Sequence, residues 1–393
     1  MVRQLIRVFA VLTVAAVAAP TAEANSGKDF IAEAREFQRI VTCGGTAKVP
    51  ADSAKIVARH CRSMKRHAKK YKNGWVRRAG NFLRKKRPAQ LPTKVVYPFG
   101  GGDLVSSLTT YPDATEITSM SLEHAGDPRM IGKVKGRKLR KVLALFEGIA
   151  RRYVLVKDHK STNLRKLEKG PIPGQLAFFL FALTVHDYEV VSLRFFKIKD
   201  DGSLYYYTAA DVARLKDVKA GKLEKRWINT DYSIAFKNSE LTFKNKSGRT
   251  IVHRHIAANL DNKHFDKSAL QKHLVRKGKV AAMTKAASYL LWMNSFSAIR
   301  TYLTSNMTFM VSDSTGIPPH HAWRGGFSVV TYGKFEGIFH DQWKYLNDRI
   351  VKVWEKRRKR WLSFRYGYPD VNKNGHMMIF YPRKTRRSKT GKR

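Results

Sequence analysis

Acidic residues are scarce in this sequence. The 393 residues contain 30 Asp and Glu against 76 Lys and Arg, which gives a formal net charge of +46. The stretch 53–102 contains no acidic residue at all. A field of this size attracts polyanions and opposes self-association, so the charge balance favours an acidic partner. General solubility or a compositional bias is the alternative explanation.

Long uncharged hydrophobic runs are also absent after the N-terminal segment, so the sequence offers no later candidate for a membrane-spanning helix. The first residues, MVRQLIRVFAVLTVAAVAAPTAEA, carry two arginines, then an apolar run, then the small-residue pattern AEA. This order is typical of a secretory signal peptide, and the run is too short for a permanent anchor. We expect residues 1–24 to be removed before Asn25 and the mature protein to be periplasmic or secreted. No cysteine stands at the cleavage point, which argues against a lipoprotein.

Cysteine occurs only at Cys43 and Cys61, and the pair lacks the Cys-x-x-Cys spacing of a redox motif. An even number of cysteines in an exported chain favours one disulfide. Apolar residues at helical spacing before Cys43 and around Cys61 predict two helices that face each other, with Cys61 on the inward side. The sequence therefore predicts a Cys43–Cys61 disulfide, and a redox-active pair is the alternative.

Residues 25–92 are predicted to form a basic helical hairpin that carries this disulfide. Asn73-Gly74 is expected to end its second helix, and a further helix is expected from Trp75 to Arg87. From residue 53 onward no carboxylate within it compensates its cations, so we expect contact with an acidic envelope polymer or a nucleic acid. A merely solvated face would have the same composition. The cations are Arg62, Lys65, Arg66, Lys69, Lys70, Lys72, Arg77, Arg78, Arg84, Lys85, Lys86 and Arg87.

The stretch 93–126 predicts a complete unit of strand, glycine turn, helix and strand. A β-branched and aromatic run, VVYPF, stops at three consecutive glycines. Asp103 stands at the N-cap of the following helix, which Pro112 ends. The next strand, over 115–122, is then expected to lie parallel to the first, because a helix of this length makes the right-handed crossover.

A glycine turn between a strand and a helix lets a ligand approach the backbone, and the helix N-terminus offers amide hydrogens to an anion. An acidic residue after the second strand can hold a ribose hydroxyl. However, GGGD is not the complete dinucleotide fingerprint, and Asp103 puts a negative charge where a pyrophosphate would bind. A small polar or anionic ligand and a plain structural turn are both compatible with the pattern, and no cofactor is indicated. The predicted ligand-binding residues are Gly100, Gly101, Gly102, Asp103 and Glu123.

The middle of the chain is expected to continue the sheet. A helix is predicted over 138–151 and a third strand over 153–157. Short apolar or aromatic runs separated by turn signals then predict an antiparallel β extension. These runs are 175–186, 189–199, 203–208, 240–244 and 249–258.

The last third of the chain is predicted to return to helices. An apolar stripe predicts a helix over 281–306, followed by a strand over 307–311 and a basic amphipathic helix over 342–360. Residues 384–393 are expected to be a disordered basic tail. The predicted fold class for the core domain, 93–383, is thus α/β, with a parallel strand–helix–strand core, an antiparallel β extension, and N- and C-terminal helices.

Three separated stretches carry a resemblance to a family. YPFGGGD with SLEHAGD, the helix KAASYLLWMNSFSAIR, and VSDSTGIP with YGKFEGIF resemble an uncharacterised family of exported bacterial proteins. That family is marked by a YPF-Gly-Asp turn, a Tyr-Leu and Phe-Ser-x-Ile-Arg helix, and a Ser/Thr-Gly-Ile-Pro loop. The likeness spans roughly Val95 to Trp343 and implies no established activity.

Two departures from the family pattern bear on chemistry. Ser312 stands where the family has a second acidic residue, and His124-Ala125 replaces Pro-Val. If the acidic pair of the family binds a metal or acts in acid–base catalysis, this protein lacks one of the two acidic residues, because Ser312 takes its place. The central unit is also similar to class I methyltransferase-like α/β units, although export argues against methyl transfer because the donor cofactor is cytoplasmic.

One group of residues has the chemistry of a metal site. His253 and His255 alternate on one predicted strand and so share a face, with Asp261, His264 and Asp266 close behind. Imidazoles and carboxylates suit zinc. The spacing fits no named metal motif, and the surrounding lysines disfavour a cation, so we expect no metal.

A second group of residues has the chemistry of an acid–base or anion site. His320 and His321 follow a proline-rich turn near Asp313, and an Asp-oriented histidine can act as a general base. No strong Ser or Cys nucleophile motif accompanies them, so exposed loop histidines are the alternative. Arg300 is expected to reach Asp313 or a bound anion.

Two functions remain open from the sequence. One is an envelope protein that binds a ligand between the Gly100 turn and the Asp313 loop. The other is a hydrolase- or transferase-like enzyme whose candidate catalytic residues are Asp103, Glu123, Asp313, Arg300 and His321. A deep pocket with carboxylates of raised pKa would favour the enzyme, and a filled, dry turn would favour the binding protein.

Overall fold

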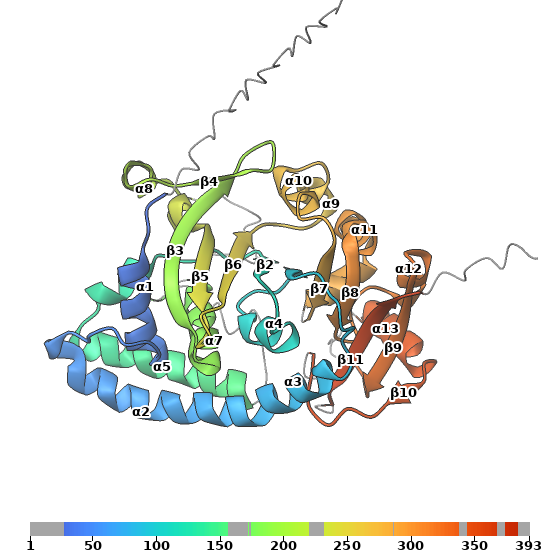
Figure 1. Ribbon diagram of the computed structural model, residues 1–393, viewed down its shortest axis with the longest axis horizontal. Helices are drawn as coiled ribbons and strands as arrows, with labels where there is room; N and C mark the ends of the chain where they lie inside the picture. Colours follow the sequence, from blue (N-terminus) through green and yellow to red (C-terminus); the bar gives the residue numbers. More distant parts are fainter. Residues whose placement is uncertain are drawn as a thin grey trace, which may run out of the picture.

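A single mixed sheet runs through the centre of the protein (Figure 1). The computed structural model describes residues 27–155, 172, 174–219, 232–285, 287–337, 344–367 and 374–383. The strands of these residues lie in the order β10-β9-β11-β8-β7-β1-β2-β6-β5-β3-β4. The signal peptide expected at 1–24 and the tail expected at 384–393 lie outside the described residues.

A parallel block in the order β8-β7-β1-β2-β6 forms the core of the sheet. The chain passes from β1 to β2 and β6 on one side and then to β7 and β8 on the other side. This is the doubly wound order of an open α/β sheet, and its topological switch point lies between β1 and β7. The strands are β1 (Lys94–Pro98), β2 (Glu116–Ser121), β6 (Thr250–Ala257), β7 (Val280–Thr284) and β8 (Met307–Ser312).

Antiparallel strands extend the parallel block at both edges. Next to β6 lie β5 (Asn238–Lys244), β3 (Glu189–Ile198) and β4 (Leu204–Tyr206). Next to β8 lie β11 (His376–Pro382), β9 (Phe327–Gly333) and β10 (Lys359–Arg360), the last of which pairs with β9 in parallel. The predicted α/β class, with its parallel core and antiparallel extension, is confirmed; the second extension beside β8 was not expected from the sequence.

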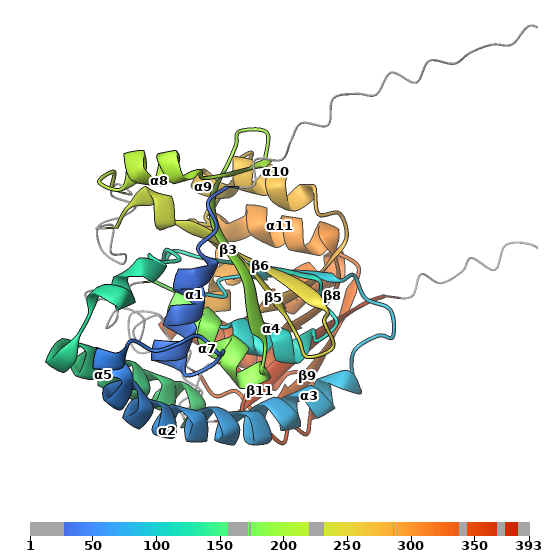
Figure 2. The same ribbon diagram turned by 60° about the vertical axis from the view of Figure 1, so that its left-hand side comes forward.

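Helices cover both faces of the sheet, because successive side chains of a strand point to opposite sides. In β1, Val95 and Tyr97 join one hydrophobic core and Val96 joins the other. The first core receives α1 (Ile31–Phe37), α2 (Ala54–Tyr71), α3 (Arg77–Arg84), α4 (Leu104–Thr110), α5 (Gly136–Leu155), α7 (Leu176–His186) and α8 (Ala209–Leu215). The second receives α9 (Asn262–Phe265), α10 (Ala269–Val275), α11 (Ser297–Asn306), α12 (Pro319–Arg324) and α13 (Lys344–Glu355). In Figure 2, α10 and α11 lie above the sheet and α2 and α5 below it.

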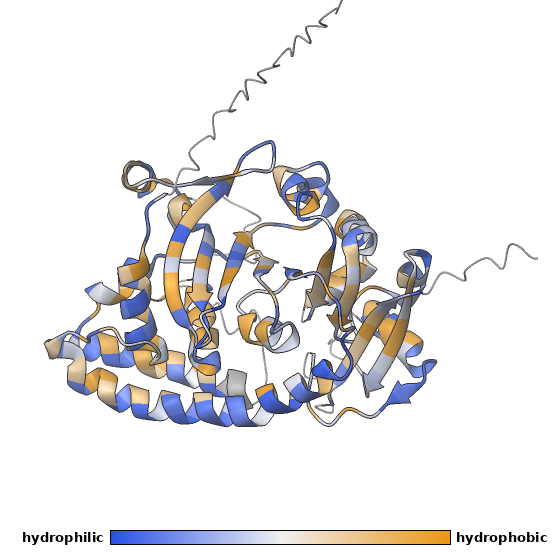
Figure 3. Cartoon of the chain, viewed as in Figure 1, coloured by the Kyte–Doolittle hydropathy of each residue, from blue (hydrophilic) through white to orange (hydrophobic). Residues whose placement is uncertain are grey.

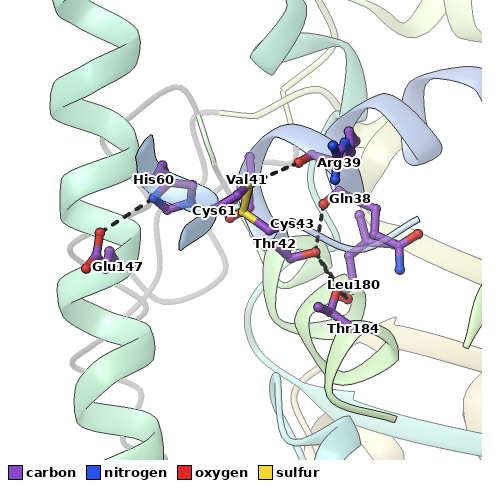
Figure 4. The surroundings of a disulfide bond; sticks show 10 residues. All are labelled: Gln38, Arg39, Val41, Thr42, Cys43, His60, Cys61, Glu147, Leu180 and Thr184. Carbon is purple, nitrogen blue, oxygen red and sulfur yellow. Dashed lines mark hydrogen bonds and ion pairs between the residues drawn. A yellow bond between two sulfur atoms is a disulfide. The ribbon is translucent and has the colours of Figure 1, made fainter. Parts of the chain in front are cut away.

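The predicted disulfide between Cys43 and Cys61 is present and buried. Cys43 ends the first helical segment in the left-handed conformation, and Cys61 lies in α2. Beside it, the His60 ring is hydrogen-bonded to the Val41 carbonyl at 2.8 Å and lies 3.7 Å from the Glu147 carboxylate of α5 (Figure 4). The bond therefore joins the two N-terminal helices where both pack on the first core.

The second helix does not end at Asn73-Gly74 as expected. A π-helical turn, Lys72–Val76, connects α2 to α3 without a break. Within this turn, Trp75 is buried and stacks on Tyr71 with ring centroids 5.6 Å apart. Packing of these rings on the core outweighs the local preference of Asn-Gly for ending a helix. The helical backbone therefore runs from Ala54 to Arg84, along the base of Figure 1.

Residues 175–186 were expected to be a strand, but they form helix α7. Apart from Thr184, every residue from Leu176 to Val185 in this helix is buried. A helix that is apolar on all sides has no polar face, so its sequence lacks the 3.6-residue periodicity that identifies surface helices. The prediction was wrong because a short buried helix and a buried strand have the same apolar pattern.

Residues 281–306 were expected to be one helix, but the segment begins with strand β7 and reaches α11 through two short 3₁₀ turns. Strands buried on both faces read as continuous apolar runs, and alanine-rich ones resemble helices. Residues 153–155, expected to begin a strand, instead extend α5, and 156–157 lie outside the described residues. The C-terminal helix is shorter than expected, since α13 ends at Glu355. Within the described ranges, no helix combines the length and hydrophobicity that a membrane crossing requires.

Candidate functional site

Polar side chains gather at the carboxyl edge of the parallel strands, next to the switch point between β1 and β7. Asp103 follows β1 through the glycine turn and caps α4, accepting a hydrogen bond from the Ser106 amide at 3.2 Å. Lys285 directly follows β7, and Asp313 directly follows β8. Ligands of doubly wound proteins bind outside this edge, so the position agrees with the site expected from the sequence.

Lys285 and Asp103 form a buried ion pair in this cluster. The Lys285 ammonium donates to the Asp103 carboxylate at 3.0 Å and to the Ser106 hydroxyl at 2.9 Å. The Tyr97 hydroxyl donates to the same Asp103 oxygen at 3.0 Å. The Lys285 and Asp103 side chains are only 2% and 4% exposed, so the pair is withdrawn from solvent. Such a pair persists only where hydrogen bonds satisfy both charges, as they do here.

Two aromatic rings enclose Lys285. Its ammonium lies 5.4 Å from the ring centroid of Trp75, in the π-helical turn, and 5.4 Å from that of Tyr366. Burial lowers the pKa of Lys285, and the carboxylates of Asp103 and Asp313 oppose this shift. The rings and carboxylates together hold a cation away from water.

Asp313 is held by its own network of hydroxyl groups. Its carboxylate accepts from Ser288 at 2.8 Å and from the Thr315 hydroxyl at 2.6 Å. Ser312 is buried, receives a hydrogen bond from Thr284 at 2.8 Å and donates to the Asp313 carbonyl. It stands where the family that the sequence resembles is expected to have an acidic residue. The site therefore holds one carboxylate at the end of β8, which accepts from two hydroxyl groups and lies close enough to Lys285 for their charges to interact.

The glycine turn is filled by neighbouring side chains. A Cβ atom at Gly102 would lie 2.7 Å from the Gln175 side-chain oxygen and 2.8 Å from Phe178 of α7. At Gly100 it would meet the Tyr97 ring at 2.7 Å. Gly101 has a positive φ of 48°, which favours glycine. Close packing and one left-handed residue thus explain the glycines without a ligand.

The remaining predicted site residues lie apart from this cluster. The Glu123 carbonyl, just after β2, accepts a hydrogen bond from the His255 ring at 2.8 Å. Arg300 belongs to α11 on the second core and donates to the carbonyls of Leu291 and Met293 at 2.6 and 3.2 Å. The structure therefore brings Asp103 and Asp313 together through Lys285 but places Arg300 on the opposite face of the sheet. His321 lies in α12, whose Ala322 packs into the same second core as α11.

The five residues weighed as metal ligands are divided between two places. His253 and His255 are buried beneath Phe179 of α7 and both contact the Ser119 hydroxyl, at 2.9 and 3.3 Å. Asp261 instead caps α9 and pairs with the His264 ring at 2.7 Å. Among the described residues, no group of three or more His, Cys, Asp or Glu side chains is arranged to hold a metal.

Lys285 was missed at the sequence level, although it completes the cluster. It was read as part of a helix, whereas it is the first residue after β7. Recognition of Val280–Thr284 as a buried strand would have placed Lys285 at the carboxyl edge, beside the end of β1. The signal is weak because the strand is short and contains two helix-favouring alanines.

The second candidate site is a basic surface on the continuous helix α2–α3 and the adjacent helix α5. α2 and α5 pack against each other, and in Figure 3 the outer side of the long helix is largely hydrophilic. We call this the basic helical surface. Its exposed residues are Lys55, Arg59, Arg62, Lys65, Arg66, Lys69, Lys70, Arg77, Arg78, Arg84 and Lys85, with Arg137, Lys138, Arg140, Lys141 and Arg151 from α5.

Few carboxylates lie near the basic helical surface. Among the described residues, the lysine and arginine ion pairs of the long helix and its C-terminal extension are Lys72–Asp187 and Arg87–Asp113. Neither involves an exposed cation of the surface. Two histidines of α2, His60 and His67, contact the Glu147 carboxylate of α5. A groove of about 1000 Å³ between α2 and α5 is lined by cations and by one acidic residue, Glu147. The contribution of α5 was missed from the sequence, because its cations lie about 70 residues after those of α2.

Comparison with known proteins leaves the family open. No family model matches the chain, and no curated protein has a significantly similar sequence. The segments on which the family resemblance rests include the turn after β1, the residues after β7 and the loop after β8. They therefore meet at one edge of the sheet, but membership of that family remains a prediction.

Proposed function

We propose that this protein is exported and binds an acidic polymer of the cell envelope through the basic helical surface. The observation that carries the proposal is the row of exposed cations along α2–α3 and α5, which the acidic residues of the described chain leave largely unneutralised. A helix of 31 residues is about 45 Å long, so a polymer lying along it meets many charges at once. Each contact releases counterions from the polymer, which supplies most of the binding free energy.

Nucleic acid is a less favoured partner for this surface. The aromatic residues of the long helix are Tyr71 and Trp75, which are buried, and Phe82, which is half-buried. The long helix therefore has no fully exposed aromatic ring on which a base could stack, and it would bind a nucleic acid through its phosphates alone. We expect binding to depend on charge density, with little preference for sequence.

A salt titration of two matched variants tests the proposal. The first replaces Lys65, Lys69, Lys70 and Lys141 on the basic helical surface by Gln. The second replaces Lys263, Lys267, Lys352 and Lys356. These residues are exposed in or next to α9, α10 and α13, on the other face of the sheet. Both lose the same charge, so net charge alone predicts equal effects.

Binding to heparin and to random-sequence duplex DNA is measured by fluorescence anisotropy between about 50 and 200 mM salt. We expect the first variant to bind DNA more weakly than the wild type. Its slope of log affinity against log salt concentration should be smaller in magnitude by roughly 0.9 for each lost phosphate contact. The second variant should match the wild type in both quantities. Heparin should bind at least as tightly as DNA. Equal losses in both variants, or affinity independent of salt, would contradict the proposal. Export is tested separately: the N-terminus of protein from an envelope or culture fraction should be Asn25.

A second candidate function is the binding or conversion of a small polar ligand at the cluster of Asp103, Lys285 and Asp313. Its support is the location of these charged groups at the switch point of the sheet. Because Trp75 and Tyr366 enclose Lys285, a ligand would have to displace them. Labelling with an amine-reactive anhydride, followed by peptide mass spectrometry, tests such opening. We expect slow modification of Lys285 in the native protein, and complete protection would contradict this function.

A further inference from the structure

A pocket of about 500 Å³ lies at the carboxyl edge of the sheet, on the face opposite the Lys285 cluster. The residues after β7 supply one wall, the loop after β8 and α12 supply another, and α13 supplies the third. We call it the histidine–arginine pocket. It is lined by Trp292, Met293, Asn294, Pro318, His320, His321, Tyr345, Leu346 and Arg349.

The charges around this pocket have one sign. None of the described residues that line it is acidic, and Arg349 projects from α13 with its guanidinium 5.6 Å from the Tyr345 ring. Arg300 and Arg324 are close enough for their charges to act on the two histidines. Burial is the main cause that lowers the pKa of His321 to about 4, and the charges of Arg300, His320 and Arg324 lower it further. The imidazole is therefore neutral at pH 7 and can donate one hydrogen bond.

Trp292 contributes an unsatisfied buried donor to the wall of the pocket. Its side chain is 93% buried, since only 7% is exposed, and its indole N–H has no hydrogen-bond partner among the described residues. Buried donors are nearly always satisfied, and an unpaired one costs about 1–3 kcal/mol. The nitrogen itself is shielded from solvent, so an acceptor in the pocket that Trp292 lines would reach it only after the indole turns.

Arg300 holds the wall that carries Trp292. Its guanidinium donates to the carbonyls of Leu291 and Met293, the residues on either side of Trp292. In this arrangement Arg300 is a positioning residue that also adds positive potential. Its partners among the described residues are backbone oxygens, so its charge is not cancelled by a carboxylate.

We propose that the histidine–arginine pocket binds a small anion whose phosphate or carboxylate group is attached to an aromatic or apolar body. Arg349 and the histidine N–H groups meet the anionic group. Met293, Pro318, Leu346 and the Tyr345 ring contact the body. The pocket volume lies within the range of small-molecule sites, and its position outside the carboxyl ends of parallel strands is that of ligand sites in open α/β sheets.

Calorimetric titration with three probes tests this site. Phenyl phosphate carries both features, inorganic phosphate lacks the body, and benzyl alcohol lacks the charge. We expect phenyl phosphate to bind at least tenfold more tightly than either of the others. Equal binding of phenyl phosphate and inorganic phosphate would overturn the role of the apolar wall, and equal binding of benzyl alcohol would overturn the role of the charges.

Variants locate the binding. Arg349→Gln and His321→Gln should each weaken phenyl phosphate at least fivefold, whereas Lys352→Gln, which lies on α13 outside the pocket, should leave it unchanged. Arg349 is exposed, so its replacement should not affect folding, which circular dichroism verifies. No binding by the wild type, or the same loss in Lys352→Gln, overturns the proposal. Quenching of Trp292 emission by phenyl phosphate in the wild type, lost in a Trp292→Phe variant, gives an independent readout.

Discussion

Lys285 and Asp103 are 182 residues apart in the sequence, yet the Lys285 ammonium lies 3.0 Å from the Asp103 carboxylate in the interior of the protein. Each follows a parallel strand, and the two strands, β7 and β1, are neighbours in the sheet. The pair therefore follows from the doubly wound topology. The carboxyl ends of two strands that are far apart in the sequence lie next to each other at the switch point.

Replacement of Lys285 by Met should destabilise the protein strongly, because it leaves the Asp103 carboxylate buried without its counter-charge. Loss of one partner of a buried pair costs roughly 3–5 kcal/mol. Asp103→Asn keeps the oxygen that caps α4 and removes the charge. In urea unfolding, the stability lost in the double variant should be smaller than the sum of the losses in the two single variants. The difference should be about 1 kcal/mol or more, on the order of the coupling in other contacting pairs. Additive effects would mean that the two charges do not stabilise each other.

The packing explanation of the glycine turn predicts opposite outcomes for two Gly→Ala changes. At Gly102 the added methyl group meets Gln175 and Phe178, so the free energy of unfolding should fall by about 1–3 kcal/mol. At Gly80, in α3, the nearest atom is 3.8 Å away, and Ala should stabilise the helix by up to about 1 kcal/mol. Chemical denaturation measures both. A neutral Gly102→Ala variant would show that the turn has room for a ligand.

Glu116 should make stability depend on acid pH. Burial alone would raise its pKa, but Lys277 and Arg254 outweigh this and lower it from 4.5 to about 2. The Lys277 ammonium lies 2.5 Å from the carboxylate. A lowered folded-state pKa gives stability that is fully present above the unfolded-state pKa and is lost as the pH falls through the folded-state value. Stability should thus decline between about pH 5 and pH 2, with about 3 kcal/mol from this group.

The matched variant for this prediction is Glu116→Gln, which cannot titrate. Its free energy of unfolding at neutral pH should be lower, because Lys277 and Arg254 lose a partner. Its decline over the acid range should be smaller than that of the wild type. Parallel curves for the two proteins, recorded by urea unfolding at each pH, would assign the acid sensitivity to other carboxylates.

The disulfide should contribute to stability through the unfolded chain. Cys43 and Cys61 are separated by 18 positions, and closing a loop of this size lowers the entropy of the unfolded state by an amount worth about 3 kcal/mol. A Cys43→Ser/Cys61→Ser protein should therefore unfold at lower denaturant concentration, with a folded-state spectrum like that of the wild type. Native protein should not react with iodoacetamide until it is reduced and unfolded. Two reactive thiols in the untreated protein would show that the bond does not form.

Local features of the fold could be predicted from the sequence because they depend on neighbours along the chain. The Cys43–Cys61 pairing followed from cysteines on helix faces that turn toward each other. The strand, the turn and the Asp103 cap followed from β-branched residues, glycines and a capping side chain within a few positions. The antiparallel strands β3, β4 and β5 followed from short apolar runs separated by turn residues.

Tertiary structure decided what local patterns do not encode. The run from Leu176 to Val185 is apolar apart from Thr184, so only its burial on all sides, beneath the sheet, selects a helix over a strand. Lys285 has a role only because β7 inserts beside β1, and the α5 cations join the basic helical surface only because α5 packs along α2. Charge and periodicity belong to the sequence itself, whereas the meeting of distant residues depends on the order of strands, which hydrophobic burial of the whole chain selects.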